Sequence, residues 1–205
     1  MKVSMVLDGI YYALGLSAGG AAVWYLTRPA FAVPFFLLAA FCLYFFRDPD
    51  RAIPDGPVVV SPADGKVVAI RNDASQPARI SIFLNIFDVH VNRAPIAGAI
   101  AKVDYRRGQF LVASREVASA ENEQNMVTIH GPDSDVTFSQ IAGLIARRIV
   151  FYKKPGDVVA KGERVGLIKF GSRVDVFLGP EWEIAVKSGE RVSAGSSILA
   201  RRRIA

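Results

Sequence analysis

The sequence contains few residues that bind metals or form cross-links. Its 205 residues include one cysteine, Cys42, and two histidines, His90 and His130. A single cysteine excludes an intramolecular disulfide framework and a cysteine-rich metal site. Two histidines leave little room for a histidine-rich metal centre. The sequence therefore predicts no metal site.

Charged residues are missing from two long apolar runs near the N-terminus, residues 9–26 and 30–46. Each run is close to the lower limit of about 17 residues for a helix that crosses a hydrocarbon core. Thr27-Arg28-Pro29 separates them, so we expect residues 1–46 to form a membrane-anchoring helical hairpin, which either spans twice or dips in and returns. A secretory signal peptide is disfavoured, because a second apolar run follows without a small-residue cleavage site.

Basic residues outnumber acidic ones by 25 to 19, which gives a formal net charge of +6. They are dispersed along the chain and accompany no nucleic-acid motif, so we expect no nucleic-acid partner. Attraction to an anionic membrane or lipid explains the charge, and a contribution to solubility alone explains it equally well. Lys2, Arg47 and Arg51 flank the hairpin, so the positive-inside rule places the main domain on the cytoplasmic side of the cell membrane.

Residues 47–205 have the pattern of a mainly β domain, with β-branched runs punctuated by glycine and proline. The run at 58–70 indicates two strands around a Pro-Ala-Asp-Gly turn, and further runs at 99–105, 126–130 and 136–141 indicate more strands. Residues 140–152 are ambiguous between a short helix and strands around Gly143. The predicted fold class is thus a β domain preceded by a hydrophobic helical hairpin.

An internal repeat near the C-terminus refines this prediction. KPGDVVAKGERVGLI (154–168) and KSGERVSAGSSILA (187–200) share the spacing of their lysines, glycines and valines. The glycines allow tight turns and the alternating valines face a core. Together with SPADGKVVAI, the repeat resembles the strands of barrel-sandwich domains such as lipoyl carriers. No exposed lysine tip of a carrier is present, so the sequence favours this architecture without the carrier function.

Two polar positions stand out in the first half of the domain. Asp64 lies in the Pro-Ala-Asp-Gly turn, where an Asp-Gly pair is ordinary turn chemistry. In FDVHVNRAP, strand alternation places Asp88, His90 and Asn92 on one face of an otherwise apolar stretch. A lone histidine is more often structural, but a polar face here needs partners. The function of His90 therefore stays open on these residues alone.

Ser172 is the third candidate, in LIKFGSRVDVFLG. It follows Gly171 between two strand-like segments, and Gly-Ser is a common turn dipeptide. The Gly-x-Ser-x-Gly motif of hydrolases is absent. A fold can nevertheless assemble a distant serine, histidine and aspartate into a nucleophile, a base and an orienting carboxylate. His130, in TIHGPDSD, is expected to be solvated instead.

Five motifs in order resemble the short-form phosphatidylserine decarboxylase family. They are FFRDPDRAIP (45–54), VVSPADGKV (59–67), FDVHVNRAP (87–95), IAGLIARRI (141–149) and KFGSRVDVFLG (169–179). The resemblance implies a proenzyme that cleaves itself between Gly171 and Ser172 into chains 1–171 and 172–205. It also implies that Ser172 becomes a covalent pyruvoyl cofactor, which forms a Schiff base with phosphatidylserine and yields phosphatidylethanolamine.

The same resemblance assigns roles to other residues. FDVHVNRAP holds the only histidine among the motifs, so His90 is taken as the base and Asp64 as the carboxylate. The long-form enzymes carry two histidines here: counting back from Pro95, His90 matches the first and Arg93 the second, whereas a shifted gap matches His90 to the second. Arg93 is a candidate ligand of the substrate phosphate or carboxylate. A homo-oligomer is plausible for the family.

Two other functions remain to be distinguished from this one. The anchor and the repeat are compatible with a membrane-tethered adaptor that has no catalysis, although the coiled-coil heptads of such adaptors are missing. A decarboxylase of another seryl phospholipid, such as an ether lipid, fits the same motifs. An adaptor has no reason to be cleaved at Ser172, so cleavage there distinguishes the decarboxylase from the adaptor.

Overall fold

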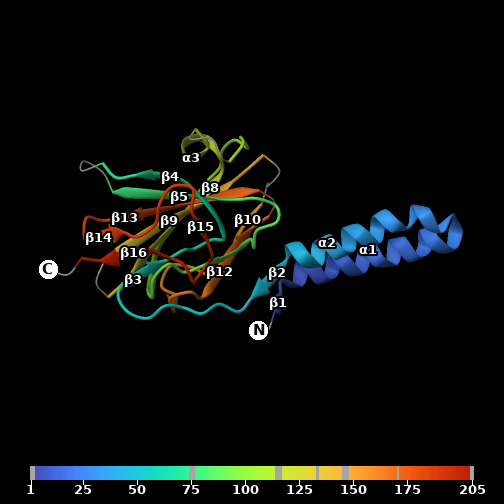
Figure 1. Ribbon diagram of the computed structural model, residues 1–205, viewed down its shortest axis with the longest axis horizontal. Coiled ribbons are helices and arrows are strands. Elements are labelled where there is room, and N and C mark those ends of the chain that lie inside the picture. The colour runs from blue at the N-terminus through green and yellow to red at the C-terminus, as the bar shows by residue number, and fades with distance from the viewer. Residues whose placement is uncertain are drawn as a thin grey trace. The chain divides into compact units, whose positions relative to one another are not determined.

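The computed structural model describes residues 3–73, 77–113, 117–132, 134–144, 148–169 and 171–203. The chain divides into two compact units, Met1–Asp50 and Arg51–Ala205. The first is helical, and the regular elements of the second are almost all strands (Figure 1). A mainly β fold with an N-terminal helix pair is therefore confirmed.

The N-terminal unit is a helical hairpin whose two helices run side by side (Figure 1). Helix α1 covers Leu7–Leu26, a 3₁₀ turn η1 covers Pro29–Phe31, and α2 covers Val33–Phe45. Two short strands, β1 (Val3–Met5) and β2 (Arg47–Pro49), pair antiparallel where the hairpin begins and ends. Among the described residues, neither helix combines the length and the hydropathy needed to cross a bilayer.

Small residues allow the two helices to pack closely. A Cβ atom added to Gly9 would lie 2.4 Å from the Cβ of Phe46, and one added to Gly20 would lie 3.1 Å from the Cβ of Phe35. Large apolar side chains nevertheless remain exposed on both helices and on the turn between them, among them Leu14, Tyr25, Leu26, Phe31 and Leu37. The helix pair therefore has little interior of its own and a mostly apolar surface.

The second unit contains fourteen named strands and one short helix among its described residues. The strands are β3 (Val58–Val60), β4 (Gly65–Arg71), β5 (Ala78–Leu84), β6 (Val91–Arg93), β7 (Gly98–Arg106), β8 (Gln124–His130), β9 (Asp135–Ala142), β10 (Ile149–Phe151), β11 (Val158–Val159), β12 (Arg164–Ile168), β13 (Ser172–Leu178), β14 (Trp182–Ile184), β15 (Arg191–Val192) and β16 (Ile198–Arg202). Helix α3 covers Ala118–Glu121. The ambiguous stretch 140–152 falls on β9 and β10, and its residues 145–147 lie outside the described part.

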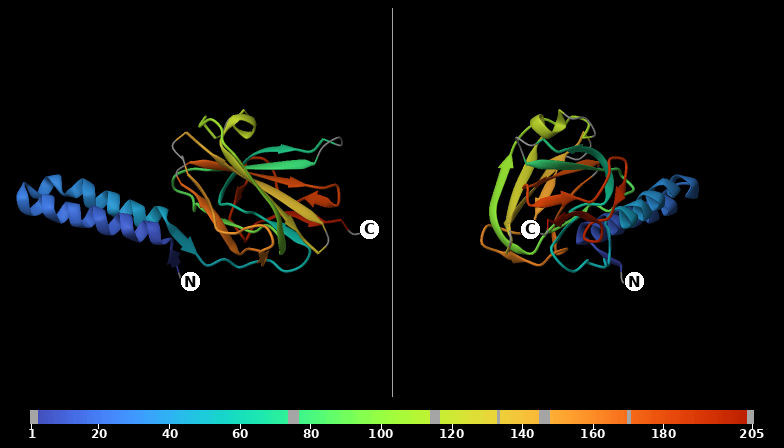
Figure 2. Two further views of the ribbon diagram at one scale, coloured as in Figure 1. Left: turned by 180° about the vertical axis from the view of Figure 1, so that it is seen from behind. Right: turned by 60° about the vertical axis from the view of Figure 1, so that its left-hand side comes forward.

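The strands form three sheets around a common core, as the views in Figure 2 show. The largest has the order β11-β7-β8-β9-β13-β5-β4-β15, with β10-β12-β6 and β14-β16-β3 as three-stranded sheets. Strand β13 lies in the middle of the large sheet, between β9 and β5. Its side chains Val174, Val176 and Leu178 alternate into the buried core, so Ser172 belongs to the same face.

The internal repeat has a structural counterpart. The first strand of each copy, β11 or β15, forms an edge of the eight-stranded sheet, and the second, β12 or β16, enters a three-stranded sheet. Gly156 and Gly189 have φ of 93° and 90°, and Gly162 and Gly195 have 77° and 78°. These left-handed turns favour glycine. The two copies of the repeat therefore supply both edge strands of the eight-stranded sheet with the same strand–turn–strand pattern.

Candidate active site

Ser172 is the first residue of β13, paired with Leu84 of β5 and Ala142 of β9. The side chain is completely buried. Within the described part of the chain, its hydroxyl oxygen has no hydrogen-bond partner. A buried polar group without a partner is unusual and needs an explanation. A hydroxyl held there is available for a reaction rather than committed to the fold.

Gly171 precedes this serine in a left-handed conformation, with φ of 59°. A side chain at this position would strain the backbone although the space around it is open. Its carbonyl oxygen packs against Gly143, where an added Cβ would lie 2.2 Å from that oxygen. Gly143, in the fourth motif, therefore has to be a glycine for the Gly171 carbonyl to lie where it does.

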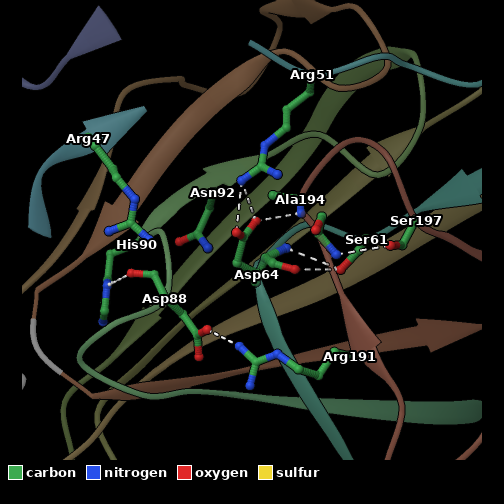
Figure 3. Close-up of polar contacts among 12 residues, drawn as sticks. Arg47, Arg51, Ser61, Asp64, Asp88, His90, Asn92, Arg191, Ala194 and Ser197 are labelled. Atoms are coloured by element: carbon green, nitrogen blue, oxygen red, sulfur yellow. Dashed lines mark hydrogen bonds and ion pairs between the residues drawn. The ribbon is translucent and has the colours of Figure 1, made fainter. Parts of the chain in front are cut away.

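His90 lies at the end of the loop that connects β5 to β6, and it is 2% exposed. Its Nδ1 is 2.9 Å from the carbonyl oxygen of Asp88 (Figure 3). Because a carbonyl only accepts hydrogen bonds, Nδ1 carries the proton, and Nε2 is the basic nitrogen of the neutral ring. The His90 carbonyl accepts from the amide of Ile168, 3.3 Å away. The His90 backbone therefore contacts the end of β12, four residues before Ser172 in the sequence.

Asp88 fixes the loop that carries His90. Its Oδ2 accepts from the Asn85 amide at 2.9 Å, and its Oδ1 pairs with the guanidinium of Arg191 (Figure 3). The Asp88 side chain is 7% exposed, whereas that of Arg191 is 63% exposed. The loop is thus bonded to the C-terminal repeat. The alternation of FDVHVNRAP placed Asp88 on one face with His90 and Asn92 but did not predict the contact with Arg191.

Asp64 is held by two other groups. Arg51 donates to both carboxylate oxygens, at 2.9 and 2.8 Å, and the Ala194 amide donates at 2.7 Å (Figure 3). Burial raises the pKa of Asp64, while the Ala194 amide and the Arg51 charge oppose this rise. Within the described residues, the hydrogen bonds of this carboxylate go to Arg51 and Ala194 rather than to His90. The structure therefore does not bring the predicted pair into hydrogen-bond contact.

Arg93 lies in β6 with its side chain almost buried. Its Nη1 donates to the carbonyl oxygen of Gly162, 3.0 Å away, in the first copy of the repeat. Strand alternation sets it on the face opposite Asn92. A role as a substrate ligand stays a prediction. His130, by contrast, is exposed and pairs with Asp135, as expected for a solvated histidine.

A chain of buried amides lies on the core side of the same end of the sheet. Gln140 of β9, which pairs with Val174 two residues after Ser172, donates to Asn92 Oδ1 at 2.9 Å. Asn125 of β8 donates to Gln140 Oε1 at 3.0 Å. Asn92 was recognisable from its position in the His90 motif. Gln140 and Asn125 were not, because each is a single polar residue in a separate strand.

The opposite face of β13 carries a buried ion pair that sequence reasoning also missed. Arg173 is completely buried and donates to Asp175 Oδ1 and to Ser81 Oγ, both at 2.6 Å. Ser119 of α3 donates to the other oxygen of Asp175 at 2.7 Å. The residue directly after Ser172 is therefore fixed to β5, and the α3 segment is attached over β13.

The arrangement provides groups for acyl transfer within the chain. A buried hydroxyl follows a glycine carbonyl. The buried His90 has its Nδ1 on the Asp88 carbonyl, and its backbone carbonyl accepts from the amide of Ile168 in the preceding segment. Among the described residues, no group of three or more histidine, cysteine, aspartate or glutamate side chains is placed to hold a metal ion. A buried serine hydroxyl and a buried imidazole are residue types that can supply a nucleophile and a base.

The family model described as phosphatidylserine decarboxylase matches residues 38–200. A phosphatidylserine decarboxylase proenzyme of Solibacter usitatus is 67% identical over 200 residues, covering 98% of this chain and 98% of that protein. Proteins of the same name from Erythrobacter litoralis and Burkholderia pseudomallei are 44% and 49% identical, covering 95% and 82% of this chain and 86% and 82% of their own lengths. All five sequence motifs lie within the matched region, and the chain belongs to the phosphatidylserine decarboxylase family.

Proposed function

We propose that this chain is a proenzyme that cuts itself between Gly171 and Ser172 and then decarboxylates phosphatidylserine to phosphatidylethanolamine. One observation carries the proposal: a fully buried serine hydroxyl without a hydrogen-bond partner in the described structure, directly after a left-handed glycine. The same residues fit a pyruvoyl group, because the orphaned hydroxyl is the atom that must react to create one.

In the cleavage reaction, Ser172 Oγ attacks the carbonyl carbon of Gly171. The peptide C–N bond breaks, the serine proton passes to the nitrogen, and an ester joins the two residues. Removal of the Ser172 α-proton then expels the Gly171 carboxylate from the β-carbon. The resulting dehydroalanine takes up one water and releases one ammonia, which leaves a pyruvoyl group on chain 172–205. No oxidant or reductant is needed.

His90 is proposed as the base for these proton transfers. The bond from Nδ1 to the Asp88 carbonyl supports this role, since it keeps the lone pair on Nε2. Asp64 remains the proposed orienting carboxylate for the base in this reaction. Its burial and its raised pKa support this role. Its bonds to Arg51 and Ala194 also hold the C-terminal repeat against the His90 side of the site.

The two products of cleavage are proposed to stay together as one enzyme. Chain 172–205 supplies β13, β14, β15 and β16, and chain 1–171 supplies the strands that flank them. Strand β13 is paired along its length with β5 on one side and β9 on the other. The new terminus at residue 172 therefore remains inside the sheet.

When formed, the pyruvoyl group supplies a carbonyl that accepts the electrons left as carbon dioxide departs. The chain binds and orients the amine substrate around residue 172. The substrate is a membrane lipid, and the exposed apolar helices support a membrane-bound protein. The positive residues at the ends of the hairpin support a catalytic unit on the cytoplasmic side of the cell membrane.

The experiment compares two Gly-Ser pairs of the same chain. Gly195–Ser196 also has a left-handed glycine, but Ser196 is partly exposed. We expect Ser172→Ala to remain one chain and to release no carbon dioxide from phosphatidylserine, whereas Ser196→Ala is cleaved and active. A wild-type chain that stays uncut and inactive would refute the proposal and favour the adaptor. If the chain is cleaved but acts only on an ether-linked seryl lipid, the proposed self-cleavage stands and only the proposed substrate is wrong.

A further inference from the structure

Three buried amide side chains form one hydrogen-bonded chain, to which the cleavage reaction described above gives no role. Asn125 Nδ2 donates to Gln140 Oε1 at 3.0 Å, and Gln140 Nε2 donates to Asn92 Oδ1 at 2.9 Å. Asn92 Nδ2 in turn donates to the carbonyl oxygen of Pro62 at 3.3 Å. All three amides are at most 2% exposed. Apolar side chains would fill the core without polar groups to satisfy, so these amides need a reason to be there.

The carbonyl of Pro62 fixes the direction of this amide chain. A carbonyl only accepts hydrogen bonds, so Asn92 turns its Nδ2 toward Pro62 and its Oδ1 toward Gln140. Gln140 then has to present Nε2 to Asn92, which leaves Oε1 to accept from Asn125. Removing the middle amide therefore leaves a buried acceptor on one side and a buried donor on the other without their partner.

A glycine in a neighbouring strand leaves room for the Gln140 amide. Gly166 of β12 pairs with Asn92 of β6. A Cβ added to Gly166 would lie 2.3 Å from the Val150 carbonyl oxygen and 3.1 Å from Gln140 Nε2. In the second copy of the repeat, the same position holds Leu199, which is buried in the core. The two copies therefore differ at the point where the amide chain passes the first copy.

The Pro62 end of the amide chain lies close along the backbone to two residues proposed for the reaction. Asn92 follows His90 by two residues, and Pro62 precedes Asp64 by two. The backbone amide of Arg93 also donates to the Pro62 carbonyl, at 3.0 Å. The strand after His90 and the turn that contains Asp64 are therefore bonded to each other.

The Gln140 end is attached to the strand that carries the nucleophile. Gln140 of β9 pairs with Val174 of β13, which lies two residues after Ser172 and on the same face. Strands β6 and β9 belong to different sheets. The hydrogen bond between Gln140 and Asn92 therefore joins two sheets through side chains, one sheet carrying Ser172 and the other beginning directly after His90.

We propose, resting on the function proposed above, that Gln140 and Asn92 are positioning residues for self-cleavage. Their hydrogen bond holds the segment that carries the base against the sheet that carries the nucleophile. Neither amide has to touch the Gly171–Ser172 bond for this role. Small displacements matter in such a reaction, because a misplacement of about 1 Å can cost about 100-fold in rate.

The test follows newly synthesised chains as each becomes two chains over time. Gln140→Met keeps the length of the side chain without its hydrogen-bonding groups, and we expect it to slow cleavage at least about tenfold. Gln124→Met is the matched control. Gln124 is the neighbour of Asn125 on the opposite face of β8, is also buried, and also makes two hydrogen bonds, with Ser119 and Ser139. This control should cleave close to the wild-type rate.

Stability is measured separately, on uncut chains that also carry Ser172→Ala. Gln140→Met and Gln124→Met should lower the free energy of unfolding to a similar extent, because each removes two buried hydrogen bonds. A purely structural role of Gln140 would then give the two variants the same cleavage rate, and that result would overturn the inference. If Gln140→Met does not fold, Asn125→Leu takes its place. It removes only the outer bond of the amide chain and should also slow cleavage relative to Gln124→Met.

A chain that carries both Asn92→Leu and Gln140→Met shows whether the two residues share one role. If both act through their common hydrogen bond, the double variant cleaves about as slowly as the slower single variant. Rate losses that multiply, or a wild-type cleavage rate in Gln140→Met, would overturn this inference alone. A wild-type chain that never cleaves would overturn the proposed function, and this inference with it.

Discussion

The two units of the chain treat polarity in opposite ways. The helical unit leaves apolar side chains exposed: Tyr25 is 88% and Leu26 76% exposed. The β unit buries polar ones, and Ser172, Arg173 and Asp175 are all fully buried. Neither choice helps an isolated soluble domain, because exposed apolar area and buried polar groups both cost free energy.

The difference shows what offsets the free-energy cost of the buried polar groups and of the exposed apolar surface. Buried polar groups in the β unit are bonded to one another in places such as the Arg173–Asp175 pair, whereas the Ser172 hydroxyl has no hydrogen-bond partner in the described structure. The apolar surface of the helices has no counterpart within its own unit. We propose chemistry at Ser172 and contact with lipid as the corresponding functions, and four variants test the contrast between the two units.

The largest effect is expected from the buried histidine. His90→Gln should slow self-cleavage at least about 100-fold, because a general base is lost. The rate is measured as the appearance of two chains over time. His130→Gln changes the exposed histidine and should cleave at the wild-type rate. Equal self-cleavage rates for the two variants would mean that His90 is not the base.

Breaking the buried ion pair next to Ser172 should cost stability. Arg173→Met removes the partner 2.6 Å from Asp175 and leaves the longer contact to Arg79, at 3.9 Å. We expect the free energy of unfolding to fall by about 3 kcal/mol. Denaturation of the uncut Ser172→Ala chain provides the measurement. Lys102→Met removes an exposed pair with Asp104, which should cost less than about 1 kcal/mol. Similar losses in both variants would mean that burial does not distinguish the two pairs.

The exposed helix surface should determine membrane binding. Leu37 is 67% exposed on α2, and Leu37→Glu should weaken binding to anionic vesicles at least about tenfold, because an apolar contact is replaced by a charge. Co-sedimentation with vesicles measures the bound fraction. Val158→Glu makes the same kind of change on the β unit and should bind normally. If both variants bind like the wild type, the helices are not the membrane contact.

The smallest effect concerns Asp64, whose pKa is raised by burial against the opposing effects of Ala194 and Arg51. The folded protein then binds the proton of the Asp64 carboxyl group more tightly than the unfolded chain does. The contribution of the protonated Asp64 to stability is therefore lost as pH rises through the pKa of the folded state. The unfolding free energy of the Ser172→Ala chain, relative to the same chain with Asp64→Asn, should rise on acidification from pH 7. A fall would mean that the ion pair with Arg51 outweighs burial.

Local patterns predicted the parts of the fold that depend on near neighbours. The two uncharged runs became α1 and α2, and the runs at 99–105, 126–130 and 136–141 became β7, β8 and β9. The repeat predicted matching turns because its glycines are needed at left-handed positions. These features are fixed by residues a few positions apart.

Contacts across long separations were not predictable in the same way. Arg173 and Asp175 alternate with valines, a pattern that indicates a solvated face, yet Ser119 of α3 covers them from 56 residues away. Asp64 finds its amide donor at Ala194, 130 residues along the chain. The motifs predicted candidate residues, but only the fold determines the partners of these residues.

The intact mass of the purified protein tests the central claim most directly. The account predicts two chains, 1–171 and 172–205, with the smaller one blocked at its N-terminus. That chain should be lighter by one ammonia than the product of simple hydrolysis. A single chain that persists through long incubation with lipid, or a small chain with a free N-terminal serine, would contradict the formation of a pyruvoyl group at Ser172.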